Sequence, residues 1–168
     1  MPFMNAKPIV MGASWFQEAS FCEQKLYLSK VKKLPLIETK EMAEGALIHE
    51  GKYEDFAKKA EPITWEEFFK SDELVTSREV ELQHISNNVV LLGRIDELSC
   101  DKDGVYVVDD KPSDYAYIGN RKQIWAYCHL LENTFKDLIG KPIYALLKNR
   151  DTGEIVWKEK YSGAHKEQ

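Results

Sequence analysis

The sequence predicts a mixed α/β domain, and three features of its patterning carry this prediction. The first third of the chain repeats apolar residues at helical spacing, which is typical of helices packed by one face. The middle third changes to alternation of period two over residues 79–84, followed by apolar runs typical of strands. A further helical segment and two more strand-like runs follow. This order favours a mixed central sheet of about five strands flanked by helices.

Length and composition narrow the class of protein. The chain has 168 residues, which suits one domain spanning 1–168. Its net charge of −5 excludes a protein that coats nucleic acid through bulk charge. It has no run of about 20 apolar residues and no secretory leader, so we expect no membrane association and a cytoplasmic protein. Three widely spaced cysteines, without a CxxC pair, argue against a disulfide framework.

Three helices are expected in the first third. Ser14 is a candidate cap for a helix that extends to about Tyr27. A second helix is expected from about Thr39 to Ala60, and residues 64–67 read as a capping box for a short third helix. The apolar stripe of the second helix, which also carries His49, consists of Met42, Ala46, Tyr53, Phe56 and Ala60.

The strands and the last helix follow from turn signals. We expect strands at 79–84, Val89–Asp96 and Val105–Asp110, the last two joined by a hairpin turn at 101–104. A helix follows from about Asn120 to Asn133. The chain then forms a hairpin of 143–147 and 155–161.

Two acidic residues and a lysine stand at the ends of neighbouring apolar strands. Asp96 and Asp109 each close a strand of one predicted hairpin, so their carboxylates could reach one point. Two converging carboxylates repel each other unless a cation lies between them, and oxygen ligands suit Mg²⁺ or Mn²⁺. Lys111 lies two residues after Asp109 and therefore on the same side of the strand. Such a set suits phosphodiester hydrolysis.

Each of these residues also has a purely structural interpretation. The acids and Lys111 could be solvated charges at strand ends. His49 could be a packed, hydrogen-bonded histidine on an apolar stripe. Gln123 and Tyr127, which share a helix face by their i, i+4 spacing, could belong to an amphipathic core helix.

The ordered combination of motifs resembles the RecB-like branch of the PD-(D/E)XK nuclease superfamily. The motifs are Gly-Ala-Leu-Ile-His49, Gly-Arg-Ile-Asp96, Val-Val-Asp109-Asp110-Lys111 and Gln123-Ile-Trp-Ala-Tyr127. Within that branch the chain is most similar to the CRISPR-associated exonucleases of spacer acquisition and their viral relatives. The similarity extends to the opening segment from Ser14 to Leu28. It implies a restriction-endonuclease-like core.

The resemblance also implies a role for each motif residue. The metal ligands would be His49, Asp96, Asp109 and the backbone carbonyl of Asp110. Lys111 would position the attacking water, and Gln123 and Tyr127 would face the substrate phosphates. The catalytic set is therefore Lys111, Asp96, Asp109, Gln123 and Tyr127.

The cysteines depart from the pattern of many relatives, which hold an iron–sulfur cluster with one early and three late cysteines. Cys22 occupies the first position, but no cysteine follows Cys128, and Cys100 lies at a strand end. Three thiolates cannot make a four-thiolate site within one chain. We therefore expect no iron–sulfur cluster.

Single-stranded DNA or DNA ends are the expected substrate. Arg121 and Lys122 are candidate phosphate contacts, and Tyr115 and Tyr117 are candidates for stacking on bases. The leading hypothesis is an Mg²⁺- or Mn²⁺-dependent deoxyribonuclease, acting as an exonuclease in CRISPR adaptation and antiviral defence, viral DNA processing or repair. A catalytically silent adaptor that binds DNA, or a partner such as a CRISPR integrase or helicase, is the alternative. A Ca²⁺-binding domain built on the turn at 101–104 has too few ligands.

Overall fold

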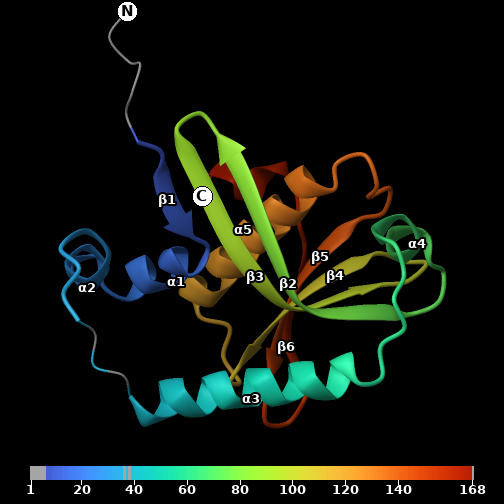
Figure 1. Cartoon of the computed structure of the whole chain (residues 1–168), viewed down its shortest axis with the longest axis horizontal. Coiled ribbons are helices and arrows are strands. Elements are labelled where there is room, and N and C mark those ends of the chain that lie inside the picture. Colours follow the sequence, from blue (N-terminus) through green and yellow to red (C-terminus); the bar gives the residue numbers. More distant parts are fainter. Residues whose placement is uncertain (1–6, 36, 38, 168) are drawn as a thin grey trace, which may run out of the picture.

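The structure is a computed structural model that describes residues 7–35, 37 and 39–167, and it confirms the mixed α/β class. Its sheet has six strands in the order β1-β3-β4-β5-β6, with β2 paired to β3 off this path (Figure 1). The strands are β1 (Ile9–Gly12), β2 (Val75–Ser86), β3 (Val89–Cys100), β4 (Val105–Lys111), β5 (Ile143–Asn149) and β6 (Ile155–Lys160). The strand beyond the expected five is β1, whose four residues are too few to show a period.

The sheet combines antiparallel hairpins with two parallel pairings. β2 with β3, β3 with β4, and β5 with β6 are antiparallel, as the sequence predicts. β4 and β5 run parallel because the helix between them returns the chain to the same end of the sheet. β1 also runs parallel, beside β3.

The helices follow the predicted order with corrected boundaries. They are α1 (Ser14–Phe21), α2 (Glu23–Leu26), the π-helix η1 (Tyr27–Val31), α3 (Lys40–Ala57), α4 (Trp65–Lys70), α5 (Ile118–Thr134) and the 3-10 helix η2 (Gly163–Glu167). The expectation that Ser14 caps the first helix is wrong, because Ala13 occupies that position without a side-chain bond. The helix also ends earlier than expected, since Cys22 is extended. The capping box of α4 is confirmed, with Thr64 and Glu67 bonding reciprocally.

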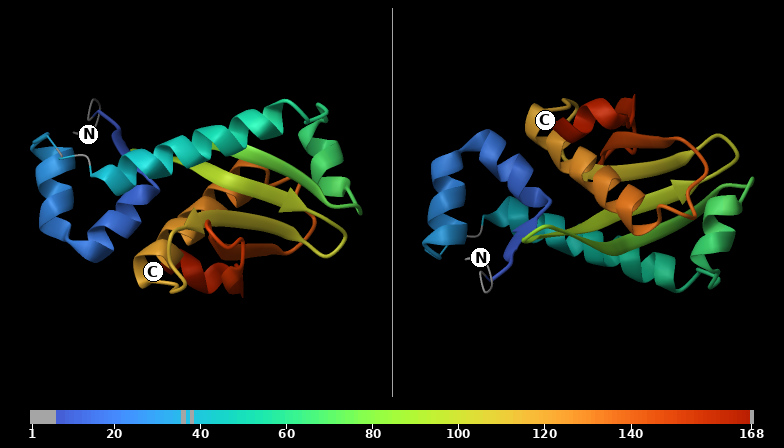
Figure 2. Two further views of the ribbon diagram at one scale, coloured as in Figure 1. Left: turned by 90° about the horizontal axis from the view of Figure 1, so that it is seen from below. Right: turned by 90° about the horizontal axis from the view of Figure 1, so that it is seen from above.

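The core lies between the sheet and α5. Ile124 and Leu130 of α5 are fully buried, as are Leu98 of β3 and Val107 of β4. Further views place the strands between α5 and α3 (Figure 2). None of the helices in the described part of the chain combines the length and apolar character that a membrane span requires.

Helix α3 is attached differently from α5. The expected packing of its apolar stripe is wrong, because the 18 residues of α3, all described, include none that is buried. Met42 and Tyr53 remain 52% and 45% exposed. Its ion pairs with distant segments are made by His49 and Lys52. The apolar pattern predicts the helix correctly but does not specify a surface against which the helix packs.

Strands β3 and β4 separate part of the way along their length. Their ladder pairs Cys100 with Val105 and ends where Glu97 meets Val108. Beyond that point β3 stays with β2, whereas β4 stays with β5, so the two pairs of strands diverge (Figure 1). We call this divergence the fork. Asp96 and Asp109 are the first residues beyond the ladder on their strands.

Gly93 allows α5 to lie close to β3. A Cβ atom there would approach Leu130 Cδ1 to 2.6 Å and Tyr127 Cδ1 to 2.9 Å, which real Cβ atoms do not tolerate. Any side chain would push α5, and with it Tyr127, away from the strand.

We expect Gly93→Ala to lower the free energy of unfolding by about 1–3 kcal/mol through overpacking. Gly140→Ala is the matched control, because a Cβ there meets nothing within 4 Å. Urea unfolding followed by circular dichroism measures both. Equal stability of the two variants would contradict the assigned contact between β3 and α5.

Candidate metal-dependent active site

Asp96 and Asp109 face each other across the fork. The backbone N–H of Asp110 donates to Asp96 Oδ2 at 3.0 Å, which links the diverging strands. The Asp96 and Asp109 carboxyls are also close enough to share a hydrogen bond. The structure therefore brings together the two acids that the sequence placed at neighbouring strand ends.

Burial governs the charge of this pair. Asp109 is 2% exposed, and burial raises its pKa to about 7; the Lys111 ammonium opposes the rise and the Asp96 charge adds to it. Burial likewise raises the pKa of Asp96, against the bond from the Asp110 amide. Burial and the two acids raise the pKa of Tyr127, which keeps its phenol protonated. The pair thus holds its negative charges at an energetic cost.

Lys111 is held by a short polar chain from α5. Its Nζ lies 3.0 Å from Asp109 Oδ2 and donates to Gln123 Oε1 at 3.1 Å. Gln123 Nε2 in turn donates to the Tyr127 hydroxyl at 2.8 Å. Gln123 and Tyr127 therefore share the helix face that their spacing predicts, and that face is directed at Lys111.

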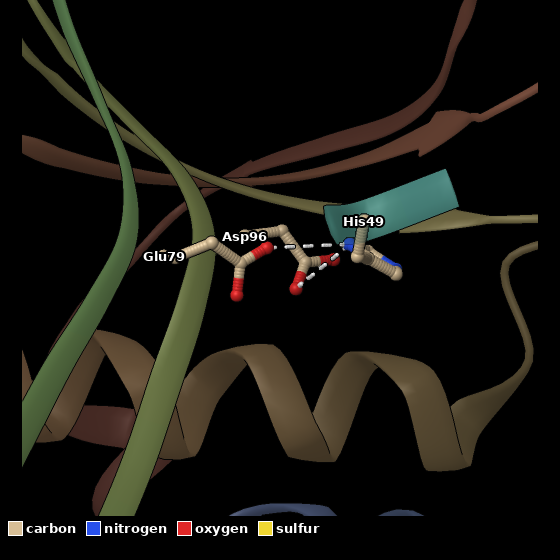
Figure 3. A group of neighbouring side chains, drawn as sticks. All are labelled: His49, Glu79 and Asp96. Atoms are coloured by element: carbon tan, nitrogen blue, oxygen red, sulfur yellow. Dashed lines mark ion pairs between the residues drawn. The ribbon is translucent and has the colours of Figure 1, made fainter. Parts of the chain in front are cut away.

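His49 of α3 lies beside Asp96 and a further acid, Glu79. Its Nδ1 lies 3.5 Å from Glu79 Oε1 and 3.7 Å from Asp96 Oδ1 (Figure 3). Sequence reasoning assigned no function to Glu79, which it treated as one residue of an alternating strand. The backbone of Glu79 is left-handed, with φ of 53°, and nothing in the residue pattern reveals such a conformation.

A cleft of about 810 Å³ opens onto these groups. Its lining includes Gly12, Ala13, Ser14, His49, Glu81, Leu82, Gln83, Leu92, Gly93, Arg94, Asp96, Asp109, Lys111, Gln123 and Tyr127. Arg94, whose side chain is 61% exposed, bonds to Glu79 Oε2 at 2.8 Å, and the two residues line an adjoining hollow with His49. Sequence reasoning quoted Arg94 within a motif but gave it no role.

Asp110 points away from the cleft. Its carboxylate lies 2.6 Å from Lys52 Nζ of α3 and 3.4 Å from Lys148 Nζ of β5, and Lys148 also pairs with Glu97. Burial opposes ionisation, but the two lysines outweigh it and lower the pKa of Asp110. The N–H and C=O of one strand residue point to the same edge, so the Asp110 carbonyl is expected to face the fork. That is the group predicted as a ligand.

The predicted DNA contacts lie outside the cleft lining. Arg121 packs over the Trp157 ring and donates to the Ala116 carbonyl, so its guanidinium already has partners. Lys122 lines a separate hollow on the other side of α5. Tyr115 and Tyr117 are exposed and contact each other edge to face, so their rings remain accessible from solvent.

The donor groups at the fork fit a divalent cation. His49, Glu79 and Asp96 each offer one ligand atom, and these atoms lie within 4.8 Å of one another. Asp109 Oδ2 is buried, and its charged partner is the Lys111 ammonium at 3.0 Å. Imidazole with carboxylates suits a first-row ion such as Mn²⁺, and carboxylates alone suit Mg²⁺. The three cysteines are free, Cys22 exposed and the other two buried.

Comparisons with known proteins assign the chain to no family. No protein-family profile matches the chain, and no curated protein matches it. Among solved structures it is similar to one described as "Crystal structure of SSO0001", with 14% sequence identity and a TM-score of 0.47. That similarity covers 95% of this chain and 70% of the other.

The raised pKa of Asp109 predicts how stability changes with pH when metal is chelated. The folded protein keeps a proton that the unfolded chain releases near pH 4. The contribution of this group to stability is therefore complete below pH 4 and is lost as pH rises towards about 7. We expect Asp109→Asn to be more stable than wild type at pH 8, by up to roughly 4 kcal/mol, and to lose this advantage near pH 4.

Urea unfolding in EDTA at pH 4, 6 and 8 measures this difference. Asp137→Asn, at an exposed position, is the control and should track the wild type. An Asp109→Asn variant less stable than wild type at pH 8 would show that the ion pair with Lys111 outweighs burial.

The ion pair between Lys52 and Asp110 predicts how firmly α3 is held. Because α3 buries none of its residues, removing one of its few polar anchors should let it open more often. We expect Lys52→Ala to speed amide hydrogen exchange in α3 by at least about fivefold, equivalent to about 1 kcal/mol. Exposed Lys59→Ala should leave the rates unchanged. Equal rates in all three proteins would exclude Lys52 as an anchor.

Proposed function

We propose that this protein is a metal-dependent nuclease that hydrolyses phosphodiester bonds in DNA. The observation that carries the proposal is the convergence of Asp96, Asp109 and Lys111 at the fork, within one cleft. A structural role explains none of this well, because two like charges buried together weaken a fold. Strands that separate around buried acids are better explained by a ligand that neutralises them.

A bound Mg²⁺ or Mn²⁺ would polarise the phosphate and lower the pKa of an attacking water. His49, Asp96, Asp109 and the carbonyl of Asp110 are the groups that would hold it. Lys111 would orient the water, because its ammonium is fixed between Asp109 and Gln123. The same ammonium would stabilise the negative charge that develops on the phosphate oxygens.

Tyr127 is suited to contacting the substrate, and Gln123 to positioning Tyr127. The Tyr127 oxygen accepts a hydrogen bond from Gln123, which leaves the phenolic proton free to be donated within the cleft. A phosphate oxygen is the acceptor that such a site would receive. Gln123 therefore fixes both Lys111 and Tyr127, and its own role is to position them.

The charge distribution agrees with a substrate that binds locally. The net charge of −5 gives little general attraction for DNA, so contacts must come from individual cations and the metal. Arg94 is an exposed cation in the cleft lining. The exposed rings of Tyr115 and Tyr117 offer stacking to unpaired bases. Both features favour single-stranded DNA or DNA ends.

The motif resemblance supports an exonuclease of the RecB-like type. CRISPR adaptation, viral DNA processing and repair are the settings in which such an enzyme acts, beside an integrase or helicase. That the enzyme uses Mg²⁺ or Mn²⁺ and holds no iron–sulfur cluster stays a prediction of the sequence.

Cleavage of end-labelled single- and double-stranded DNA in Mn²⁺ or Mg²⁺ tests the proposal. We expect the wild type to cleave, EDTA to abolish cleavage, and Lys111→Ala to reduce the rate by at least about 100-fold, as loss of a charge-stabilising group does. Asp109→Asn should be similarly impaired while remaining folded.

Lys102→Ala is the matched control, since Lys102 is exposed in the turn at the far end of the β3–β4 hairpin. It should cleave at the wild-type rate. If wild-type protein leaves both substrates intact with either metal, the proposal fails. DNA binding without cleavage would instead favour the silent adaptor.

A further inference from the structure

Glu79 occupies an unusual backbone conformation at the edge of the site. A left-handed glutamate within a strand is strained, and the pairing of β2 with β3 skips this position. The strand presents different faces before and after Glu79. Arg78, which precedes it, pairs with Glu97 near Lys148, whereas Leu82, which follows it, lines the cleft. The kink thus turns the strand over and leaves Glu79 directed at His49.

The two carboxylates around His49 are arranged alike. Asp96 Oδ2 is held by the Asp110 amide, and Glu79 Oε2 is held by Arg94. The other oxygen of each, Asp96 Oδ1 and Glu79 Oε1, faces His49 Nδ1 (Figure 3). Each carboxylate is therefore fixed by one oxygen and presents the other to a common point.

The separations at that point suit a metal better than hydrogen bonds. At 3.5 and 3.7 Å from the two oxygens, the imidazole nitrogen is too distant for a good hydrogen bond to either. Metal–ligand bonds of about 2.1 Å place neighbouring ligand atoms roughly 3–4 Å apart. The imidazole nitrogen lies at such a spacing from both oxygens, and all three ligand atoms lie within 4.8 Å of one another.

The charges around the group are unbalanced. Three carboxylates, Glu79, Asp96 and Asp109, meet there, and the cations beside them are Arg94 and Lys111. His49 adds a charge only when protonated. Asp109, nearly fully buried and lining the cleft, has Lys111 as its charged partner at 3.0 Å. A divalent cation beside these acids would offset the remaining negative charge.

We propose that Glu79 is a metal ligand, and that it joins His49 and Asp96 in holding a divalent cation beside Asp109. The inference rests on the proposed metal-dependent function and adds to it a ligand from β2. Imidazole ligation favours Mn²⁺ over Mg²⁺ at this position. Arg94 holds Glu79 Oε2 and competes with the cation for the charge of Glu79.

The competing explanation is that Glu79 serves only as the ion-pair partner of Arg94. The two explanations predict opposite effects of removing Arg94. If Glu79 is a ligand, Arg94→Met frees its charge, and Mn²⁺ binds equally or more tightly. If Glu79 acts through Arg94, then Arg94→Met weakens Mn²⁺ binding as Glu79→Gln does.

Titration of metal-free protein with Mn²⁺, without DNA, tests the inference, with unbound Mn²⁺ measured by electron paramagnetic resonance. We expect Glu79→Gln to weaken binding by at least about tenfold. Glu81→Gln is the matched control, since Glu81 lies two residues along β2 and lines the same hollow as Glu79. It should bind within about twofold of wild type.

A second variant separates binding from folding. Asparagine tolerates the left-handed region better than glutamate but is too short to replace the Glu79 carboxylate. We therefore expect Glu79→Asn to unfold at the same or a higher temperature than wild type while losing Mn²⁺ affinity. Unchanged Mn²⁺ affinity in this variant and in Glu79→Gln, with affinity lost in His49→Asn, would overturn the inference.

The outcomes also distinguish this inference from the proposed function. Mn²⁺ binding that depends on Glu79, in a protein that cleaves no DNA, would support the ligand and reject the nuclease. Cleavage with Mn²⁺ affinity independent of Glu79 would do the reverse. A wild-type protein that binds no Mn²⁺ and cleaves no DNA with either metal would reject both.

Discussion

The divergence of β3 from β4 is the constraint on which the site depends. The ladder between β3 and β4 ends at Glu97 and Val108, so the next residue of each strand is not paired with the other strand. These residues are Asp96 and Asp109, and their carboxylates occupy the opening. Burial makes their charges costly, and their proximity makes them costlier. The bonds from the Asp110 amide and Lys111 only partly offset this cost. The residues that α3, α5 and β2 contribute to the site surround this incompletely neutralised negative charge.

Adjacent acids in β4 show how strand alternation divides roles. Asp109 faces the cleft, where burial raises its pKa, whereas Asp110 faces Lys52 and Lys148, which lower its pKa. One residue is left in need of a cation and the other is already neutralised. Asp110 therefore adds little negative charge to the site, while its amide supports Asp96 and its carboxylate anchors α3. Stability and function are thus carried by the two faces of one strand.

The sequence predicted the parts of the site that local geometry determines. A short turn joins β3 and β4, so Asp96 and Asp109 had to be neighbours, and the i, i+4 spacing of Gln123 and Tyr127 gave them one helix face. What it missed depends on tertiary placement. The left-handed Glu79 has no residue signal, and Lys52 and Lys148 meet Asp110 from distant segments. The apolar stripe of α3 predicted a helix correctly but a packing face wrongly, because periodicity does not specify a partner.

The attachment of α3 depends on the same incompletely neutralised acids. This helix carries His49 to the fork and is held by charged contacts with Glu79, Asp96 and Asp110, instead of a buried apolar face. A cation shared by His49 and the acids would add a stronger link between α3 and the sheet than any it now makes. Metal binding and docking of α3 would then be one event. A helix packed through a buried apolar stripe would stay docked with or without metal. The docking of α3 would instead depend on whether the cation is bound.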